Sequence, residues 1–253
     1  LSTGLNIDPI VVVQKAVPGL YSDISSVEID TYLAETAAAL TVEHPDYSYL
    51  AARIKVNSLH KETPGFIIAT KNLYDDGLLR EEYFKKVMEN ADTIESIIDY
   101  DKDYTFDYFA LTTLIRAYLL KFDNRTIERP QDLWMRVTLT VTGNEFNLDK
   151  IKETYKSLSS GMYTHATPTL FNSGLKMQQL SSCFLIGMED DSIEGIFNTI
   201  KDCALISKTA GGIGMHAHNI RGSGSRIKST NGKSNGLIPV SYTHLTLPTI
   251  CSV

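Results

Sequence analysis

Residues 180–220 read LSSCFLIGMEDDSIEGIFNTIKDCALISKTAGGIGMHAHNI, and this stretch decides the fold. It opens on a short apolar run of strand length, residues 180–188. A segment with helical apolar spacing follows, and its expected apolar face consists of Ile193, Ile196, Phe197, Ile200 and Ala204. The glycines after Ala210 end this helix, and residues 213–220 have the character of a second strand. Strand, helix and strand in this order predict a βαβ unit, which belongs to an α/β layer or barrel.

The first 160 or so residues predict helices joined by short turns. Ser25 and Glu28 have the spacing of a capping box, in which each residue satisfies a backbone N–H of the other. Apolar residues then recur with helical periodicity. Further helices are expected over residues 81–98, 106–120, 130–141 and 148–158. The fold class is therefore a mostly helical region followed by α/β structure.

Composition excludes several classes of protein. The chain has 253 residues, of which 43% are hydrophobic and 21% charged, so it is neither disordered nor collagen-like. Its formal net charge of −6 argues against a nucleic acid polymer as partner. Three cysteines indicate a reducing compartment. No apolar run reaches the roughly 20 residues of a membrane helix, and no signal peptide is visible, so we expect a cytoplasmic protein with no membrane partner.

The front of the chain lacks an initiator methionine, and from this we expect that the natural N-terminus is missing.

Two short motifs are each compatible with a purely structural role and with a functional one. Cys183 lies inside the first predicted strand, where a cysteine is either a small buried hydrophobe or a redox thiol beside substrate-binding hydroxyls. Residues 164–174, THATPTLFNSG, form either an ordinary turn that enters a strand or a set of donors for a phosphate. Cys203 is expected in the core of the following helix.

The glycine-rich segment from residue 208 to 229 has a composition typical of a phosphate-binding loop. Its glycines allow backbone amides to approach an anion, and its positive charges are Lys208, Arg221, Arg226 and Lys228. It matches neither a P-loop nor a dinucleotide fingerprint. Asp191 and Ser192 either cap the helix or hold a sugar hydroxyl. His216 and His218 alternate on one strand without further ligands, so no metal site is expected.

Taken together, these stretches resemble the large, catalytic subunit of class I ribonucleotide reductase. The resemblance rests on THATPTLFN (164–172), QLSSCFL (179–185), DDSIEG (190–195), CALISKTAGGIG (203–214), GSGS (222–225) and TNGKSNG (230–236). Upstream segments that agree are HPDY (44–47), AARI (51–54), YLLK (118–121) and ERPQ (128–131). The matches run in the same order from about residue 1 to residue 239.

The resemblance implies a domain plan. Residues 1–62 would be a partial ATP-cone without its leading hairpin, and residues 63–160 a helical N-terminal domain. Residues 161–239 would begin a ten-stranded α/β barrel, truncated after its first strands, and would include the specificity-effector loop. Residues 240–253 depart from the family and are expected to be an artefact resembling translated adapter sequence, with a lineage-specific end as the alternative.

The resemblance also assigns roles to residues. Cys183 would be the catalytic thiol that, with a second cysteine beyond this chain, reduces the ribose 2′ carbon and ends as a disulfide. Thr167 and Ser182 would contact the substrate. Ser26 and Asp30 match ATP-contacting positions of the cone. The expected effector-binding residues are Asp191, Ser192, Ile193, Lys208, Arg221, Lys228 and Ser229.

Substrate and partners follow from the same resemblance. The parent enzyme would convert ribonucleoside diphosphates to 2′-deoxyribonucleoside diphosphates, as an oxidoreductase of deoxyribonucleotide biosynthesis for DNA replication. Allosteric dNTP or ATP with Mg²⁺ would regulate it, with no cofactor bound covalently. A small subunit would hold the radical metallocofactor, thioredoxin or glutaredoxin would supply electrons, and large subunits would pair as a homodimer. The fragment alone is expected to be inactive; the alternative is a nucleotide-binding regulatory module without catalysis.

Overall fold

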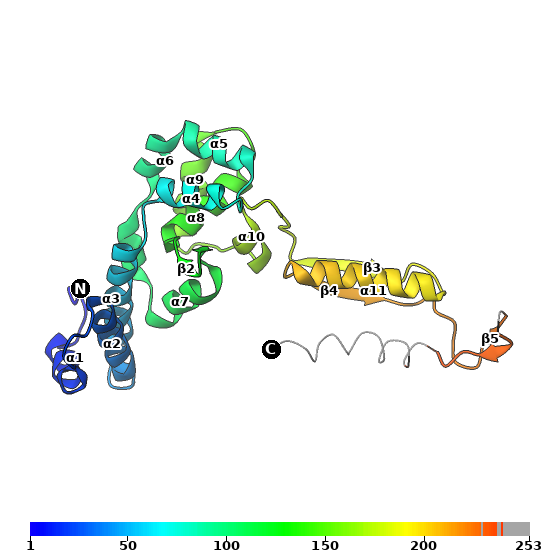
Figure 1. Cartoon of the computed structure of the whole chain (residues 1–253), viewed down its shortest axis with the longest axis horizontal. Coiled ribbons are helices and arrows are strands. Elements are labelled where there is room, and N and C mark those ends of the chain that lie inside the picture. The colour runs from blue at the N-terminus through cyan, green and yellow to red at the C-terminus, as the bar shows by residue number, and fades with distance from the viewer. Residues whose placement is uncertain (229, 237–238, 240–253) are drawn as a thin grey trace. The chain divides into compact units, whose positions relative to one another are not determined.

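The structure is a computed structural model and describes residues 1–228, 230–236 and 239 (Figure 1). Its contacts divide the chain into two units. Unit 1 comprises residues 1–165 and 170–178, and unit 2 comprises residues 166–169 and the described residues from 179 onward. The expectations for Ser229 and for the 240–253 tail lie outside the described residues.

Unit 1 is helical, as the periodicity predicts. Its longer helices are α1 (Pro9–Ala16), α2 (Ser26–Ala39), α3 (Asp46–Glu62), α4 (Phe66–Asp75), α5 (Glu81–Glu89), α6 (Ala91–Ile97), α7 (Tyr108–Thr113), α8 (Pro130–Val141) and α9 (Leu148–Ser159). Short helical turns are η1 (Val17–Gly19), η2 (Leu40–Val42), η3 (Tyr100–Thr105) and the π-helical η4 (Leu114–Tyr118). Strands β1 (Lys121–Phe122) and β2 (Arg125–Thr126) form a small antiparallel hairpin.

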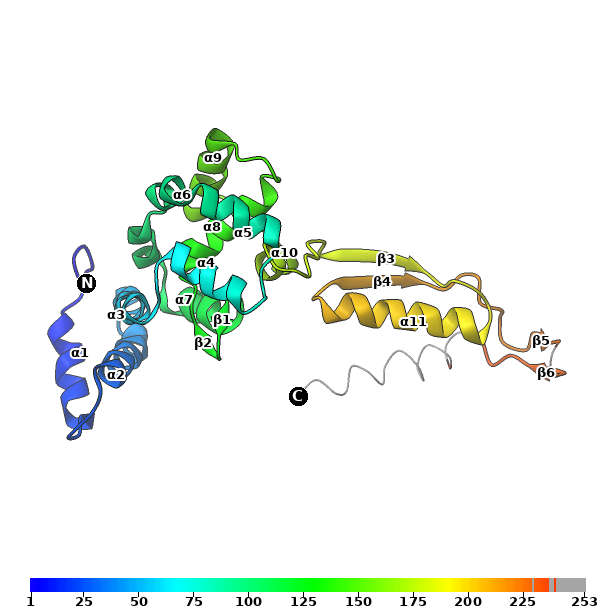
Figure 2. The same ribbon diagram turned by 45° about the horizontal axis from the view of Figure 1, so that its top comes forward.

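The predicted capping box at the start of α2 is confirmed. The Ser25 hydroxyl accepts from the backbone N–H of Glu28 at 3.2 Å, and the Glu28 carboxylate accepts from the backbone N–H of Ser25 at 2.9 Å. Helices α2 and α3 lie side by side in both views (Figures 1 and 2). Ala37, Leu50 and Ala51 are buried between them, in the small core that the helical spacing predicts.

One predicted helix is broken, which corrects the expectation of a continuous helix over 81–98, while the segment predicted over 106–120 is helical from 108 to 118. Asn90 separates α5 from α6, and its side-chain amide donates to the carbonyl of Lys86. Asn side chains compete with the helical backbone in this way. The second segment begins only at Tyr108, because Asp107 is its N-cap, and it ends in the π-helical turn η4.

Helix α8 forms the centre of unit 1. Every residue from Pro130 to Leu139 is buried, although the segment contains Gln131, Asp132 and Arg136. The helix packs against α9, η3 and η4, and Leu133 and Val137 belong to the main hydrophobic core. Buried polar groups require hydrogen-bond partners, so this helix imposes a polar network on the middle of unit 1.

Unit 2 contains the predicted βαβ unit. Strand β3 (Cys183–Gly187) pairs in parallel with β4 (Gly212–His216), with Cys183 opposite Gly212 and Gly187 opposite His216. Helix α11 (Ile193–Lys208) connects them and packs against both strands (Figure 2). A hairpin of β5 (Arg226–Ile227) and β6 (Gly232–Lys233) follows. The described residues show the start of an α/β arrangement and no closed barrel.

Strand β4 is shorter than the predicted 213–220. It ends at His216 because β3 ends opposite it, and beyond that point Ala217 and Ile220 close a turn through a backbone hydrogen bond of 3.3 Å. A strand continues only while a neighbour satisfies its backbone groups.

The segment over residues 164–174 corrects the expectation of a simple turn entering a strand. Residues 167–172 form the short helix α10 (Thr167–Asn172), and Pro168 is its second residue. Proline suits the first turn of a helix, since its missing N–H would have no helical partner there. The hydroxyl of Thr169 donates to the carbonyl of Leu180 at 3.0 Å and so attaches α10 to the segment that leads into β3.

Candidate functional site

The thiol of Cys183 lies on the open face of the β3–β4 sheet. Exposure alternates along both strands, and α11 covers the face that contains Phe184 and Ile186. Cys183 and Leu185 therefore share the uncovered face, where Cys183 is exposed and unpaired. The interpretation of Cys183 as a small buried hydrophobe is wrong for this structure, because strand parity turns it away from the helix.

Gly212 of β4 leaves open space beside this thiol, while the Leu185 side chain lies over Gly214. A Cβ on Gly212 would lie 3.6 Å from the Cys183 sulfur, and one on Gly214 would lie 2.9 Å from the Leu185 side chain. On this face β4 therefore presents backbone alone opposite the first half of β3. The glycine-rich pattern alone predicts a phosphate-binding loop for these residues. The alternation of glycines along a strand instead indicates strand backbone without side chains next to the sulfur.

Cys203 occupies a different environment. It is half-buried on α11, and burial, assisted by the charge of Asp202, raises the pKa of its thiol. The core position expected for it is therefore correct only in part. Neither described cysteine is in a disulfide.

The two thiols are expected to react at different rates. Iodoacetamide at pH 8 should alkylate Cys183 several-fold faster than Cys203, because the thiolate is the nucleophile and burial disfavours it at Cys203. Peptide mass spectrometry over time measures both rates in one sample, and labelling in urea, which should equalise them, is the control. Faster labelling of Cys203 in the folded chain would contradict this assignment of faces.

Thr167 and Ser182, the expected substrate-contacting residues, both belong to unit 2. Thr167 is the first residue of α10, and Ser182 directly precedes Cys183. The carbonyl of Ser182 accepts from the backbone N–H of Gly212 at 2.7 Å, which holds Ser182 at the edge of the glycine floor. Hydroxyls of both residues are suited to hydrogen bonds with a sugar.

Four expected effector-binding residues gather at the first turn of α11. Arg221 donates from Nε to the Asp191 carboxylate at 2.5 Å and from a terminal nitrogen to the Asp191 carbonyl at 3.0 Å. Ser192 is the N-cap, and its hydroxyl accepts from the backbone N–H of Gly195 at 3.0 Å. Ile193 is 73% exposed beside them. The capping role is thus confirmed for Ser192, while the Asp191 carboxylate is paired with the Arg221 guanidinium.

The structure does not bring Lys208 to this cluster. Lys208 is the last residue of α11, whose 16 residues span about 24 Å at 1.5 Å per residue. Since β3 and β4 are parallel, the helix returns to the end of the sheet that carries Cys183, and Lys208 comes with it. Lys228 is exposed after β5. The basic residues of the glycine-rich segment do not form one local loop within a single chain.

The expected ATP-cone residues lie in unit 1 on α2. Ser26 is exposed in the first turn, and Asp30 receives an ion pair from Lys61 at 3.0 Å. Asp30 also lines a cavity of about 470 Å³ with charged groups from Lys55, Glu62 and Arg125. Ser26 does not line it. The cavity mixes both signs of charge, which suits a ligand that offers donors and anionic oxygens.

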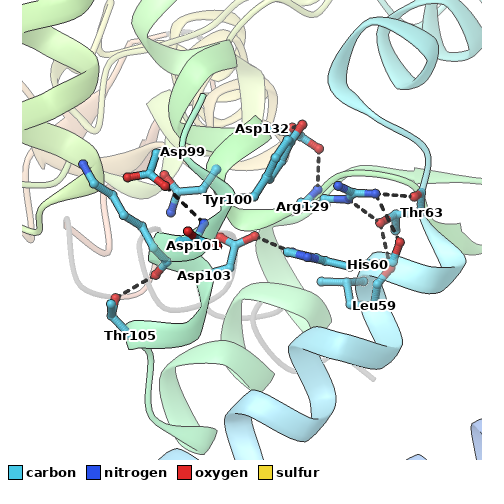
Figure 3. A network of polar contacts seen from close by, with 12 residues as sticks. Leu59, His60, Thr63, Asp99, Tyr100, Asp101, Asp103, Thr105, Arg129 and Asp132 are labelled. Atoms are coloured by element: carbon cyan, nitrogen blue, oxygen red, sulfur yellow. Dashed lines mark hydrogen bonds and ion pairs between the residues drawn. The ribbon is translucent and has the colours of Figure 1, made fainter. Parts of the chain in front are cut away.

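A polar network links the end of α3 to η3 and α8 (Figure 3). His60 contacts the fully buried carboxylate of Asp103 at 2.8 Å. Arg129 donates to the carbonyls of His60 and Thr63 at 3.1 and 2.7 Å, and its backbone N–H donates to the Asp132 carboxylate at 2.9 Å. The helix of the predicted cone is thereby attached to the centre of unit 1.

Burial gives Asp132 an unusual titration. It raises the pKa of this carboxyl to about 7 from an ordinary 3.8, against the lowering effect of hydrogen bonds from the Tyr100 hydroxyl and the Arg129 backbone. Between these pH values the unfolded chain is ionised while the folded chain holds the proton. The stabilisation from this group is therefore complete below about pH 4 and is lost as the pH rises towards 7, by up to about 1.4 kcal/mol per pH unit.

Asp132→Asn is expected to destabilise the chain most at low pH. The asparagine cannot titrate, so the loss in free energy of unfolding relative to the parent should shrink between pH 4.5 and 7.5. Urea titrations followed by the fluorescence of Trp134, the single tryptophan, measure it. Asp92→Asn, on an exposed residue, is the control. A constant difference across this pH range would show that the Asp132 proton does not contribute.

The described residues also bear on metal binding and on membrane insertion. No group of three or more His, Cys, Asp or Glu side chains there could hold a metal ion. His216 and His218 face each other with their Nδ1 atoms 2.7 Å apart, as a hydrogen-bonded pair. In the same residues, no helix has the length and apolar character needed to cross a membrane.

Comparison with family models identifies the class of protein. Residues 104–178 match the ribonucleotide reductase all-alpha domain, and residues 181–244 match the ribonucleotide reductase barrel domain. The junction between the two matches coincides with the division between the helical unit and the βαβ unit at residue 178. The chain belongs to the ribonucleotide reductase large-subunit family.

The curated relatives that the chain matches are of one kind of reductase, as their names state. The chain is 47% identical to ribonucleoside-diphosphate reductase large chain 2 of Saccharomyces cerevisiae, over 95% of this chain and 29% of the relative. It is 46% identical to the large subunits of Arabidopsis thaliana and Variola virus, again over 95% of this chain, and covers 31% and 33% of them. The chain thus spans about a third of the length of these relatives.

Proposed function

We propose that this chain is the part of a ribonucleoside-diphosphate reductase large subunit that supplies one reducing thiol and one half of an effector site. The observation that carries the proposal is the exposed Cys183 sulfur beside the backbone floor of Gly212 and Gly214. Gly212 places no side chain opposite this sulfur, which leaves room for a ribose to approach it. Family membership and 47% identity to a named reductase support the same chemistry.

The proposed reaction balances with a second thiol. Cys183 and a partner cysteine give up two hydrogens and become a disulfide, while the substrate 2′ hydroxyl leaves as water and the 2′ carbon gains hydrogen. Cys203 does not suit the partner role, because α11 lies on the covered face of the sheet. The second thiol and the hydrogen-abstracting radical would come from elsewhere in the holoenzyme, with the radical generated in a small subunit.

Substrate and reductant complete the proposal. Hydroxyls of Thr167 and Ser182 would bind the ribonucleoside diphosphate beside the sulfur. After each turnover the disulfide must be reduced, and a dithiol protein of the thioredoxin or glutaredoxin kind is suited to this exchange. By itself the chain is expected to show no turnover.

A chimaera tests the proposal. Residues 1–239 of this chain replace the matched segment of the yeast large chain 2, and the chimaera is assayed with the yeast small subunit, a dithiol reductant and labelled CDP. Formation of labelled dCDP supports the proposal. A folded chimaera that binds the small subunit and forms no dCDP, beside an active yeast control, would overturn it.

The effector site is proposed to need two copies of the chain. Asp191 and Arg221 lie at one end of α11 and Lys208 at the other, farther apart than a nucleoside triphosphate reaches. A second copy with its α11 antiparallel to the first would bring its Lys208 to Asp191. The outer surface of α11 is suited to this contact, because Ile193, Phe197 and Leu205 are exposed on it.

The triphosphate would compete for Arg221. In the structure this guanidinium binds Asp191. Binding of a dNTP with Mg²⁺ would release it towards the phosphates, while the carboxylate accepts from a sugar hydroxyl. The Asp30 cavity would in the same way take ATP as an overall regulator.

Phe197→Asp is expected to weaken the pairing of the chimaera. Loss of the burial of one Phe197 side chain should cost about 1.5–3 kcal/mol of dimerisation free energy, and a two-fold dimer contains this residue twice. Sedimentation velocity with saturating dTTP should show a dimer for the parent and a monomer for the variant at micromolar concentration. Phe109→Asp is the matched control, because Phe109 is exposed in unit 1. An undisturbed Phe197→Asp dimer would refute this interface.

A further inference from the structure

The largest fully buried side chain of unit 1 is the charged Arg136 in the middle of α8. Its guanidinium binds Glu128 through two hydrogen bonds, from Nε at 2.6 Å and from Nη2 at 3.1 Å, and both side chains are at most 3% exposed. Glu128 also accepts from the backbone N–H of Leu120 at 3.0 Å. The Glu128 carboxylate is thus held in place by three hydrogen bonds, and the guanidinium keeps further N–H groups that can donate elsewhere.

The remaining donors hold the far end of α10. Arg136 donates to the carbonyl of Leu170 at 3.1 Å and to that of Ser173 at 2.8 Å. The last carbonyls of a helix have no helical partner, so in a buried helix end they need a donor from outside. Gly174 follows with a positive φ of 76°, at a position where a Cβ would lie 3.3 Å from the Tyr83 ring, and this turn closes the segment.

We propose that Arg136 is a positioning residue for substrate binding. By holding the Leu170 and Ser173 carbonyls, it fixes the conformation in which α10 presents Thr167 from its first turn. This inference rests on the proposed function, which makes Thr167 a substrate contact. Arg136 itself does not touch the substrate in this scheme; it acts through the backbone of α10.

The geometry requires a guanidinium. Its planar fork binds one carboxylate through two donors and still donates to two carbonyls in other directions. A lysine ammonium at the same position keeps the positive charge for Glu128, but its three donors on one nitrogen cannot reproduce the fork. Arg136→Lys therefore keeps the charge that pairs with Glu128 but loses the hydrogen bonds that hold α10.

Hydrogen exchange of this chain tests the inference. In Arg136→Lys, amides of residues 167–176 should exchange at least about tenfold faster than in the parent, because two buried hydrogen bonds to a charged donor are lost. Peptides from α9 should change much less. Arg129→Lys is the matched control: Arg129, the N-cap of α8, also donates to two backbone carbonyls, but it holds α3 (Figure 3). Equal loosening of residues 167–176 in both variants would overturn the inference.

Kinetics of the chimaera supply the second readout. Arg136→Lys should raise the KM for CDP several-fold with kcat little changed, since only the presentation of Thr167 is impaired. Loosened exchange with an unchanged KM would overturn the link to the substrate, while the unaltered turnover would leave the proposed function intact. If Arg136→Lys fails to fold, Glu128→Asp, which withdraws the carboxylate by one methylene, should loosen the same residues, and absence of that effect would also overturn the inference.

Discussion

Replacing Cys183 by serine in the chimaera is expected to abolish dCDP formation, with a loss of at least about 10³-fold in kcat. Serine keeps the size and the exposed position of the side chain, but a hydroxyl cannot form a disulfide or supply reducing electrons. Substrate binding should persist, because Thr167 and Ser182 are untouched. The measurement is labelled dCDP per enzyme over time, together with a binding titration of CDP.

Cys203→Ser is the matched control for this prediction. It changes the other described cysteine, on the helix side of the sheet, and should leave turnover near that of the parent chimaera. Two results would contradict the assignment: turnover by Cys183→Ser above a tenth of the parent, or an equal loss in Cys203→Ser. Either would show that the exposed thiol is not the reducing group.

Arg136→Met should cost this chain about 3–5 kcal/mol of unfolding free energy. The methionine fills much of the space, but the Glu128 carboxylate and the carbonyls of Leu170 and Ser173 then lose their donor in the interior. Such a loss is a large part of the 5–15 kcal/mol that stabilises typical domains. Urea unfolding followed by Trp134, which lies in the same helix, measures it.

The double variant Glu128→Leu/Arg136→Met should recover part of this loss, because no buried charge remains without a partner. Recovery stays incomplete, since the Leu120 backbone N–H loses its acceptor. Lys85→Met is the surface comparison: its ion pair with Glu81 is exposed and solvent-screened, so its loss should change stability far less than Arg136→Met. A single Arg136→Met variant as stable as the parent would contradict the importance of the buried pair.

Local sequence signals predicted the elements well. The Ser25–Glu28 capping box, the helix over 130–141 and the strand–helix–strand order of residues 180–216 are all confirmed. Each signal acts over a few residues: a cap satisfies the nearest N–H groups, and an apolar period reports which side is buried. The break at Asn90 is not predicted because the apolar period continues across it.

Placement of the site residues was predictable only in part. The sequence pattern groups Lys208 with Arg221, 13 positions later in the chain, whereas the parallel pairing of β3 and β4 places them at opposite ends of α11. Conversely, Asp191 and Arg221 are 30 residues apart and form an ion pair. Contacts between distant residues leave no periodic trace in a sequence.

The sequence by itself determined the family, the helical first part, the βαβ unit and the interest of Cys183, because motifs, caps and periodicity are local properties of the chain. Only the tertiary structure decided that the Cys183 sulfur lies on the open face beside two glycines, since strand register sets the direction of each side chain. It also decided that Arg136, whose residue type is seldom fully buried, holds the end of α10 from the interior. The desolvation of that charge is compensated by partners 8, 34 and 37 residues away, which only the folded chain brings together.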